Sequence, residues 1–521
     1  MSAKFFTELL RRGVPQVVGV YLAAGWGLLE FTDWATGRFQ LPVGAEDFVI
    51  AGWIVLLPVV TGAAWRLGNP ERRHRPSGRT PAATPAISAE AGPPAEPTDI
   101  VVLPFTNLSG SAEDEYLSDG LCEEITNQLA RMEGLQIVAR TSAFMYKGKA
   151  ADVRAIGREL GAGAVLEGSV QRSGDRLRVT TQLVEVATGY HLWSERYDRQ
   201  MKDVFDIEDE IAANVVQSVR GILKPEEREA LARNPTQDVK AYEFYLRGRQ
   251  FFRQSRRKSL DYARQMFEQA VEADPGFALA WAGLSDSISL MHMYFPSDDA
   301  DLGRADEASR RALELGPELA EAHSARGFAL MQLGRFDEAE SEFQEAIRVD
   351  VGQFDARYFY ARGCFAQGRL EDAARLFREA SEVREDYQAA FFAAQALEAL
   401  GREEEAREGY REALAVAEKH MELNPDDPRA ATMRAVSHCR VGEREAGLQW
   451  AERALEIDPS DPGVQYNVAC LFSLEDQPHR AIECLERAVG GGFGNRDWIE
   501  HDPDLDPLRG HHRFQELLSR I

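Results

Sequence analysis

The sequence feature that most constrains the fold of this chain is a repeat in its second half, with a period of about 34 residues. Small residues return at fixed positions of the repeat, together with an aromatic residue. Small side chains let two helices approach closely, and an aromatic ring fills the space between them. The pattern predicts a stack of helix pairs. The recurring residues are Gly334, Ala339, Phe343 and Ala346, then Gly368, Ala373, Phe377 and Ala380, then Gly401, Ala406, Tyr410 and Ala413.

The repeat resembles the tetratricopeptide repeat, and this resemblance implies an all-α superhelix over residues 239–490 with about seven repeats. Turn signals such as Asp274-Pro275 and Asp458-Pro459 are expected to end the second helix of a pair. Residues 491–521 resemble the helical cap that covers the apolar face of a last repeat. We expect repeats at 240–275, 278–317, 320–353, 354–387, 387–425, 426–459 and 461–490.

In the tetratricopeptide family the first helix of each repeat lines the concave face, so aligning the repeats predicts which side chains face a partner protein. Arg362 and Gln395 are hard to explain as core residues, whereas Phe365 and Phe391 could instead pack between helices. We expect that changing Tyr358 and Arg362 together to alanine weakens partner capture at least about tenfold and leaves the melting temperature nearly unchanged. The predicted partner-binding residues are Phe328, Met331, Tyr358, Arg362, Phe365, Phe391, Gln395, Arg429 and Thr432.

Two apolar stretches near the N-terminus, Val14 to Leu29 and Phe48 to Trp65, predict a hairpin of two transmembrane helices within residues 1–68. Basic residues flank the pair on its outer sides and are scarce between the two stretches, so both ends are expected in the cytoplasm. The alternative, two buried core helices, is disfavoured because a Pro-rich linker follows at 69–98. We therefore expect contact with the lipid bilayer of the inner (cytoplasmic) membrane, and cytoplasmic soluble domains.

Residues 99–228 predict an α/β domain. Residues 99–105 form a short apolar run that is typical of a buried strand, and 135–139 predict another strand. Turn signals around Gly174 and Gly189 divide the following stretch into a three-stranded antiparallel meander. The meander strands are expected at 164–172, 176–186 and 190–197, and helices at 115–132, at 153–160 and after Asp203.

Several stretches of this domain, among them DIVVLPFTNLSG and EYLSDGLCEEITNQLAR, resemble a domain of bacterial proteins that is related to the amino-terminal domain of TolB. The resemblance implies a binding or sensory module with no agreed ligand, often fused to a cyclase, a kinase or a DNA-binding domain. Its landmark residues either form turns and buried polar contacts or touch a ligand, and both roles stay open. They are Asp119, Gly120, Arg140, Thr141, Ser142, Glu167, Gly168 and Glu195.

The sequence lacks the common nucleotide-binding, zinc-protease and serine-hydrolase motifs, so we expect no enzyme activity, no cofactor and no metal site. The formal net charge of −25 has the wrong sign for a nucleic-acid-binding protein. The five cysteines are scattered and form no CxxC pair, which indicates neither a disulfide framework nor a zinc site.

Two functions fit these observations. The leading hypothesis is a membrane-tethered scaffold or sensor that binds a segment of a partner protein in the tetratricopeptide groove. The alternative is a non-catalytic regulatory subunit of a signalling enzyme, in an adenylate-cyclase-like or kinase system. An oligomer is compatible with either function.

Overall fold

The computed structural model describes residues 98–521 apart from 150, 232–233, 296–298 and 494–495. All of these residues belong to the second of two compact units, Pro93–Ile521. The two apolar stretches predicted to span a membrane, and all but the end of the predicted linker, lie outside the described residues. Within the described part of the chain, no helix combines the length and the apolar character needed to cross a bilayer.

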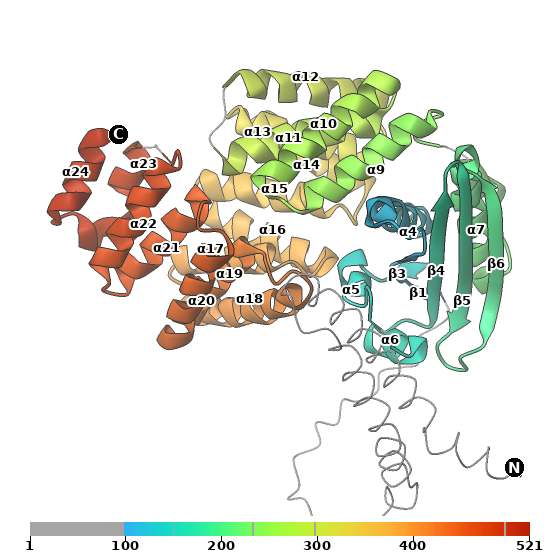
Figure 1. The fold of residues 1–521 in the computed structure, drawn as a ribbon, viewed down its shortest axis with the longest axis horizontal. Helices are drawn as coiled ribbons and strands as arrows, with labels where there is room; N and C mark the ends of the chain where they lie inside the picture. Colours follow the sequence, from blue (N-terminus) through green and yellow to red (C-terminus); the bar gives the residue numbers. More distant parts are fainter. Residues whose placement is uncertain (1–97, 150, 232–233, 296–298, 494–495) are drawn as a thin grey trace, which may run out of the picture. The chain divides into compact units, whose positions relative to one another are not determined.

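A six-stranded sheet forms the first part of the described chain (Figure 1). Its strands are β1 (Asp99–Val102), β2 (Thr106–Asn107), β3 (Gln136–Ile137), β4 (Ala164–Ser173), β5 (Arg176–Glu185) and β6 (His191–Gln200). β1 runs parallel to β3 and β4, and β2 also pairs with β4. β4, β5 and β6 form the antiparallel meander that the turn signals predict, so the strand order is β3-β1-β4-β5-β6.

Helices cover both faces of this sheet. They are α4 (Glu115–Ala130), α5 (Arg140–Phe144), α6 (Val153–Glu159) and α7 (Val204–Arg220), and α8 (Pro225–Leu231) follows α7. Ile100 and Val102 of β1 enter the core that contains α4 and α7, whereas Val101 enters the core that contains α5 and α6. Because β1 is buried on both faces, its sequence is an unbroken apolar run.

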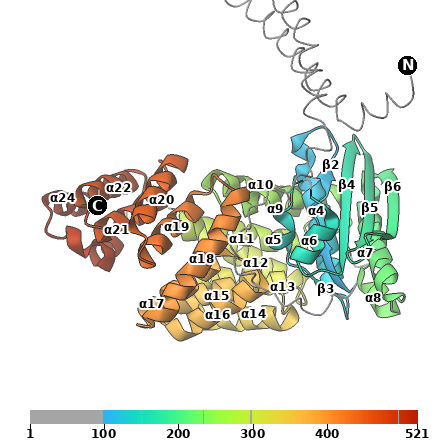
Figure 2. The same cartoon turned by 90° about the horizontal axis from the view of Figure 1, so that it is seen from below.

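Residues 239–490 form seven consecutive helix pairs (Figures 1 and 2). The first helices are α9 (Val239–Arg253), α11 (Ala278–Tyr294), α13 (Ala320–Gln332), α15 (Phe354–Ala366), α17 (Tyr387–Ala399), α19 (Pro428–Arg440) and α21 (Pro462–Leu474). The second helices are α10 (Arg257–Ala273), α12 (Asp299–Leu315), α14 (Phe336–Val349), α16 (Leu370–Val383), α18 (Glu403–Leu423), α20 (Arg444–Ile457) and α22 (Pro478–Gly490). After them come α23 (Arg496–His501), the 3-10 helix η4 (Pro503–Leu508) and α24 (His512–Arg520), which share a core with α22.

The small residues of the repeat sit where neighbouring helices touch, both within a pair and between successive pairs. A Cβ atom at Gly327 of α13 would come within 2.7 Å of the Phe343 ring of α14. In the same way, a Cβ atom at Gly248 or Gly283 would meet the Phe267 ring at 2.7 Å or 2.6 Å. The missing side chain therefore provides the space that the ring fills, and this contact sets the close approach of the helices.

The α/β domain and the first helix pair share one hydrophobic core. α4 packs on α9, and the rings of Phe205 in α7 and Tyr242 in α9 lie 4.7 Å apart. The Tyr242 hydroxyl donates a hydrogen bond of 2.9 Å to Glu208, whose side chain is buried. Burial raises the pKa of the Glu208 carboxyl well above its ordinary value, and the nearby charge of Glu124 raises it further.

This raised pKa predicts a pH-dependent stability. A carboxyl whose pKa is higher in the folded state binds more protons when folded, so its contribution to stability falls as the pH rises above the unfolded-state pKa. Glutamine at position 208 can still accept the Tyr242 hydrogen bond but carries no charge. We expect Glu208→Gln to raise the melting temperature of the full-length chain at about pH 8, and to raise it less at about pH 5.

The exposed Glu226 in α8 supplies the control, because Glu226→Gln removes the same charge at the surface. Thermal unfolding of both variants at the two pH values is the measurement. An equal shift for Glu208→Gln at both pH values, or a shift no larger than that of Glu226→Gln, would contradict the raised pKa of Glu208.

Candidate functional site

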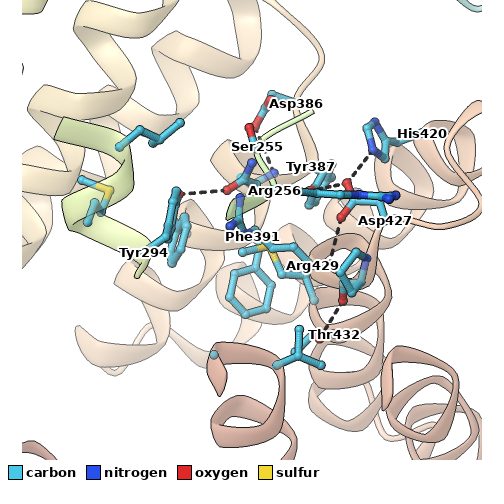
Figure 3. Close-up of a pocket in the computed structure, with 18 of the residues that line it drawn as sticks. Ser255, Arg256, Tyr294, Asp386, Tyr387, Phe391, His420, Asp427, Arg429 and Thr432 are labelled. Atoms are coloured by element: carbon cyan, nitrogen blue, oxygen red, sulfur yellow. Dashed lines mark hydrogen bonds and ion pairs between the residues drawn. The ribbon is translucent and has the colours of Figure 1, made fainter. Parts of the chain in front are cut away.

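A groove with a volume of about 2680 Å³ runs along the first helices of the array. Its walls come mainly from α9, α11, α15, α17, α19 and α21, and α4 and α5 of the α/β domain line it as well. Both aromatic and charged side chains line it. Figure 3 shows its central part, where Tyr294 of α11, Phe391 of α17 and Arg429 of α19 come together.

Seven of the nine residues predicted to bind a partner line this groove. They are Tyr358, Arg362, Phe365, Phe391, Gln395, Arg429 and Thr432. They come from α15, α17 and α19, because the first helices of these three repeats present one face to the same space. Phe391 also packs on Tyr410 of α18, with ring centroids 5.7 Å apart, so it serves the core and the groove wall together.

Phe328 and Met331 of α13 do not line the groove, and their assignment to it needs correction. The Phe328 ring is fully buried and stacks on Phe359 of α15, with centroids 3.7 Å apart. Met331 is also buried, and its sulfur packs against Gly363 of α15. Both residues fill the contact between neighbouring repeats, so helix α13 contributes packing here and not groove surface.

Tyr358 needs a second correction. It lines the groove, yet only 5% of it is exposed, and its ring packs against Phe354 and Phe377. Its hydroxyl lies 3.3 Å from the Gln388 amide oxygen, which the Tyr294 hydroxyl also contacts at 3.3 Å. Truncation to alanine would leave a cavity, which contradicts the expectation that the melting temperature stays unchanged.

Two arginines stand out among the groove residues. The Arg362 guanidinium lies over the Phe392 ring at 4.4 Å and donates a long hydrogen bond to the Tyr358 hydroxyl. The Arg429 guanidinium lies over the Tyr294 ring at 3.9 Å. Neither forms an ion pair with a carboxylate of the described residues. Burial would raise the pKa of the Tyr294 phenol, but the positive charges of Arg362 and Arg429 bring it below its ordinary value.

The nearby carboxylates are occupied by other partners. Asp427 caps α19 by accepting hydrogen bonds from the backbone N–H groups of Arg429 and Ala430. Its second oxygen lies 2.9 Å from both the Tyr387 hydroxyl and the His420 ring nitrogen. Burial opposes ionisation, but the hydrogen bond from His420 lowers the pKa of Asp427 to about 2. Asp386 caps α17 in the same manner.

The alignment of repeats missed this capping network. The signal available in the sequence is the Asp-Asp-Pro turn before α19, since Asp just before a proline at the start of a helix is typical of an N-cap. Its consequence for the groove is electrostatic. The caps use these carboxylates internally, so the Asp427 charge attracts the Arg429 guanidinium without forming an ion pair with it.

The α/β domain contributes charges to the other end of the groove. Lys147 bridges Glu115 at 2.7 Å and Asp119 at 2.6 Å, and Arg140 stacks on the Phe144 ring at 3.5 Å. Two of the landmark residues of this domain, Asp119 and Arg140, line the groove. Four others have structural contacts. Glu167 accepts a hydrogen bond from Gln182, and Glu195 accepts one from Asn214. A Cβ atom at Gly120 would clash with Leu246, and one at Gly168 would clash with the Thr180 carbonyl.

One group of potential metal ligands occurs among the described residues, namely Cys470, Asp502 and Asp504. The ligand atoms of Cys470 and Asp502 already have protein partners. The Tyr466 hydroxyl and the Cys470 thiol both donate to Asp502, which also caps η4. These hydrogen bonds connect α21 to the C-terminal helices, which gives the group a structural role.

The comparison with protein families agrees with the repeat fold. Residues 298–350, 325–382 and 361–419 match the family described as tetratricopeptide repeat. The C-terminal part of the chain is therefore a tetratricopeptide superhelix, with a small sheet region before it. Among solved structures, one titled "Crystal structure of YrrB: a TPR protein with an unusual peptide-binding site" is 22% identical, with a TM-score of 0.25, over 38% of this chain and 95% of that one.

Two curated proteins show sequence similarity. "Putative adenylate cyclase 3" of Rhizobium meliloti (strain 1021) is 38% identical over 260 residues, which cover 49% of this chain and 44% of that protein. A chloroplastic protein of Arabidopsis thaliana is 32% identical over 83 residues, which cover 15% of this chain and 25% of that protein. The chain thus spans less than half the length of each curated relative.

Because Tyr358 is buried, the single variants Tyr358→Ala and Arg362→Ala are expected to differ in stability. We expect Tyr358→Ala to lower the free energy of unfolding by about 3–5 kcal/mol, as for other large aromatic truncations. Tyr358→Phe should cost only about 1 kcal/mol, because it removes one hydrogen bond and keeps the ring. Arg362→Ala should also cost about 1 kcal/mol or less, because it removes one stacked cation.

Urea unfolding of the full-length variants measures these differences. Equal stability of Tyr358→Ala and Tyr358→Phe would mean that the ring is not part of the core. Binding experiments on this groove therefore need Tyr358→Phe and arginine variants in place of alanine at position 358.

Proposed function

We propose that this protein is a membrane-tethered interaction scaffold whose tetratricopeptide groove binds a carboxylate-rich segment of a partner protein. The observation that carries the proposal is the pair of groove arginines, Arg362 and Arg429, which lie on aromatic rings without a carboxylate partner among the described residues. Tetratricopeptide superhelices are typically non-catalytic binding platforms with an extended concave surface. The tether would be the two apolar stretches before residue 68.

Two guanidinium groups held around one phenol repel each other, and each carries several N–H donors. A carboxylate of the partner would relieve this repulsion and form charge-assisted hydrogen bonds, which are stronger than neutral ones. Neighbouring rings such as Phe365 and Phe391 would accept apolar side chains of the same segment. The groove thus favours a segment in which acidic and apolar residues alternate.

A second candidate function is supported by one comparison. The relative named "Putative adenylate cyclase 3" makes a non-catalytic regulatory role beside a signalling enzyme the natural alternative. In that role the partner would be a separate cyclase or kinase polypeptide, and the TolB-like resemblance of the α/β domain would add a sensing function. The two functions use the same groove and differ only in the identity of the partner.

Charge removal in the groove tests the proposal. We expect Arg362→Gln combined with Arg429→Gln to reduce capture of the partner at least about tenfold, which corresponds to about 1.4 kcal/mol. The matched control is Arg375→Gln with Arg378→Gln on α16, which removes two exposed guanidinium groups outside the groove. Affinity capture by the full-length protein, followed by identification of the retained proteins, is the measurement.

A defined probe makes the same test independent of the partner's identity. A peptide of alternating glutamate and leucine should bind the wild-type protein and not the groove variant, and its glutamine counterpart should bind neither. Undiminished binding of partner and peptide by the folded groove variant would move the site elsewhere. A cyclase or kinase among the retained proteins would select the regulatory function.

The tether has its own test. Because basic residues flank both outer sides of the apolar pair, both the linker near Thr80 and the C-terminus are expected in the cytoplasm. A fluorescent protein fused after Ile521 should fluoresce, and alkaline phosphatase fused at the same point should be inactive. Active phosphatase with a dark fluorescent protein would mean that only one stretch spans the membrane.

A further inference from the structure

β6 is an edge strand with an unpaired side. It extends over ten residues, pairs with β5, and has no strand on its other side among the described residues. Figures 1 and 2 both show it at the margin of the sheet. Most of its side chains are exposed, with Tyr197 as the buried exception. A long open edge offers a row of backbone N–H and C=O groups to any further strand.

The charges of β6 are arranged with opposite signs about Tyr197. Glu195 is negative and Arg196 positive on one side, and Asp198 is negative and Arg199 positive on the other. Residues at equal distance from Tyr197 therefore carry opposite charges. Edge charges commonly block pairing with other strands. The order of charges along β6, however, is complementary to a second copy of the same strand running antiparallel.

Only one register of such a pair satisfies the charges. When two copies are related by a twofold axis perpendicular to the sheet, directly opposite residues are equally far from the axis and lie on the same face. An axis at Tyr197 places Glu195 opposite Arg199 of the second copy, and Arg196 opposite Asp198. An axis at any of the four charged residues instead places that residue against itself, which is unfavourable.

Three of these side chains have the capacity to form such contacts, whereas Asp198 already accepts hydrogen bonds from Arg176 and Arg178 of β5 with both carboxylate oxygens. Arg196 has a 58% exposed side chain, and its ion partner within the chain, Asp198, is 3.7 Å away. Glu195 accepts hydrogen bonds from Asn214 and Tyr197 at 3.3 Å and 3.4 Å, and Arg199 pairs with Glu210 at 2.8 Å. α7 thus orients Glu195 and Arg199 on one face, while each keeps free donors or acceptors.

We propose that two copies of this chain pair through β6 into one continuous antiparallel sheet, with Tyr197 at the twofold axis. This inference does not depend on what the groove binds. Opposite-charge pairs directly across two strands stabilise the pairing, and like charges at the same positions destabilise it. The dimer would place two tetratricopeptide arrays in one assembly and so make partner binding bivalent.

Charge reversal and charge exchange test the interface. Glu195→Arg places like charges opposite each other at two symmetry-related positions, and so does Arg199→Glu. Each should weaken the dimer at least about tenfold. The combination Glu195→Arg with Arg199→Glu restores opposite charges and should restore the dimer. Glu404→Arg, at the exposed start of α18, is the control with the same change of charge and should leave the dimer unchanged.

The measurement is the mass of the protein component of the full-length chain in detergent, by light scattering over a dilution series. Since Glu195 and Arg199 also contact α7, thermal unfolding checks that each single variant is folded. Arg196→Glu gives a second test that leaves these α7 contacts intact, and it should also yield monomers. A monomeric wild type at every concentration, dimeric folded single variants, or an exchange variant that stays monomeric would each overturn the proposal.

Discussion

In the array, a ring of one helix fills the space left by a missing side chain on its neighbour. The rings of Phe343 against Gly327, and of Phe267 against Gly248 and Gly283, occupy space that a Cβ atom at these glycines would need. Such contacts stack the pairs so that their first helices face one groove. The groove and its chemistry therefore depend on residues that never touch a ligand.

The repeat array could be predicted from the sequence because small and aromatic residues recur at a fixed spacing. The meander was predictable for a similar reason, since Gly174 and Gly189 adopt the left-handed backbone that its turns require. The parallel placement of β1 between β3 and β4 was not predictable, because it joins segments that are distant in the chain. The short helix α5 was missed because five residues carry no periodic signal.

For the site, alignment of the repeats identified which face of a helix looks into the groove but not how deeply each residue lies. Arg429 was found by the alignment alone, whereas Arg362 and Gln395 were also hard to explain as core residues because they are polar. Phe328 and Met331 occupy an equivalent face of α13, yet α15 covers them. Of the capping network, the sequence shows the Asp427 cap in its Asp-Asp-Pro turn but not the contact of Asp427 with His420.

The core shared by the α/β domain and α9 has a consequence for biosynthesis. The ribosome releases the α/β domain before α9, and domains generally fold in the order in which they emerge. Buried residues such as Tyr242 then meet an apolar surface that is already formed, and each later helix pair finds its neighbour complete. An array assembled in this direction does not have to nucleate from an isolated helix pair, and its apolar surface is exposed at its newest end while the array is being made.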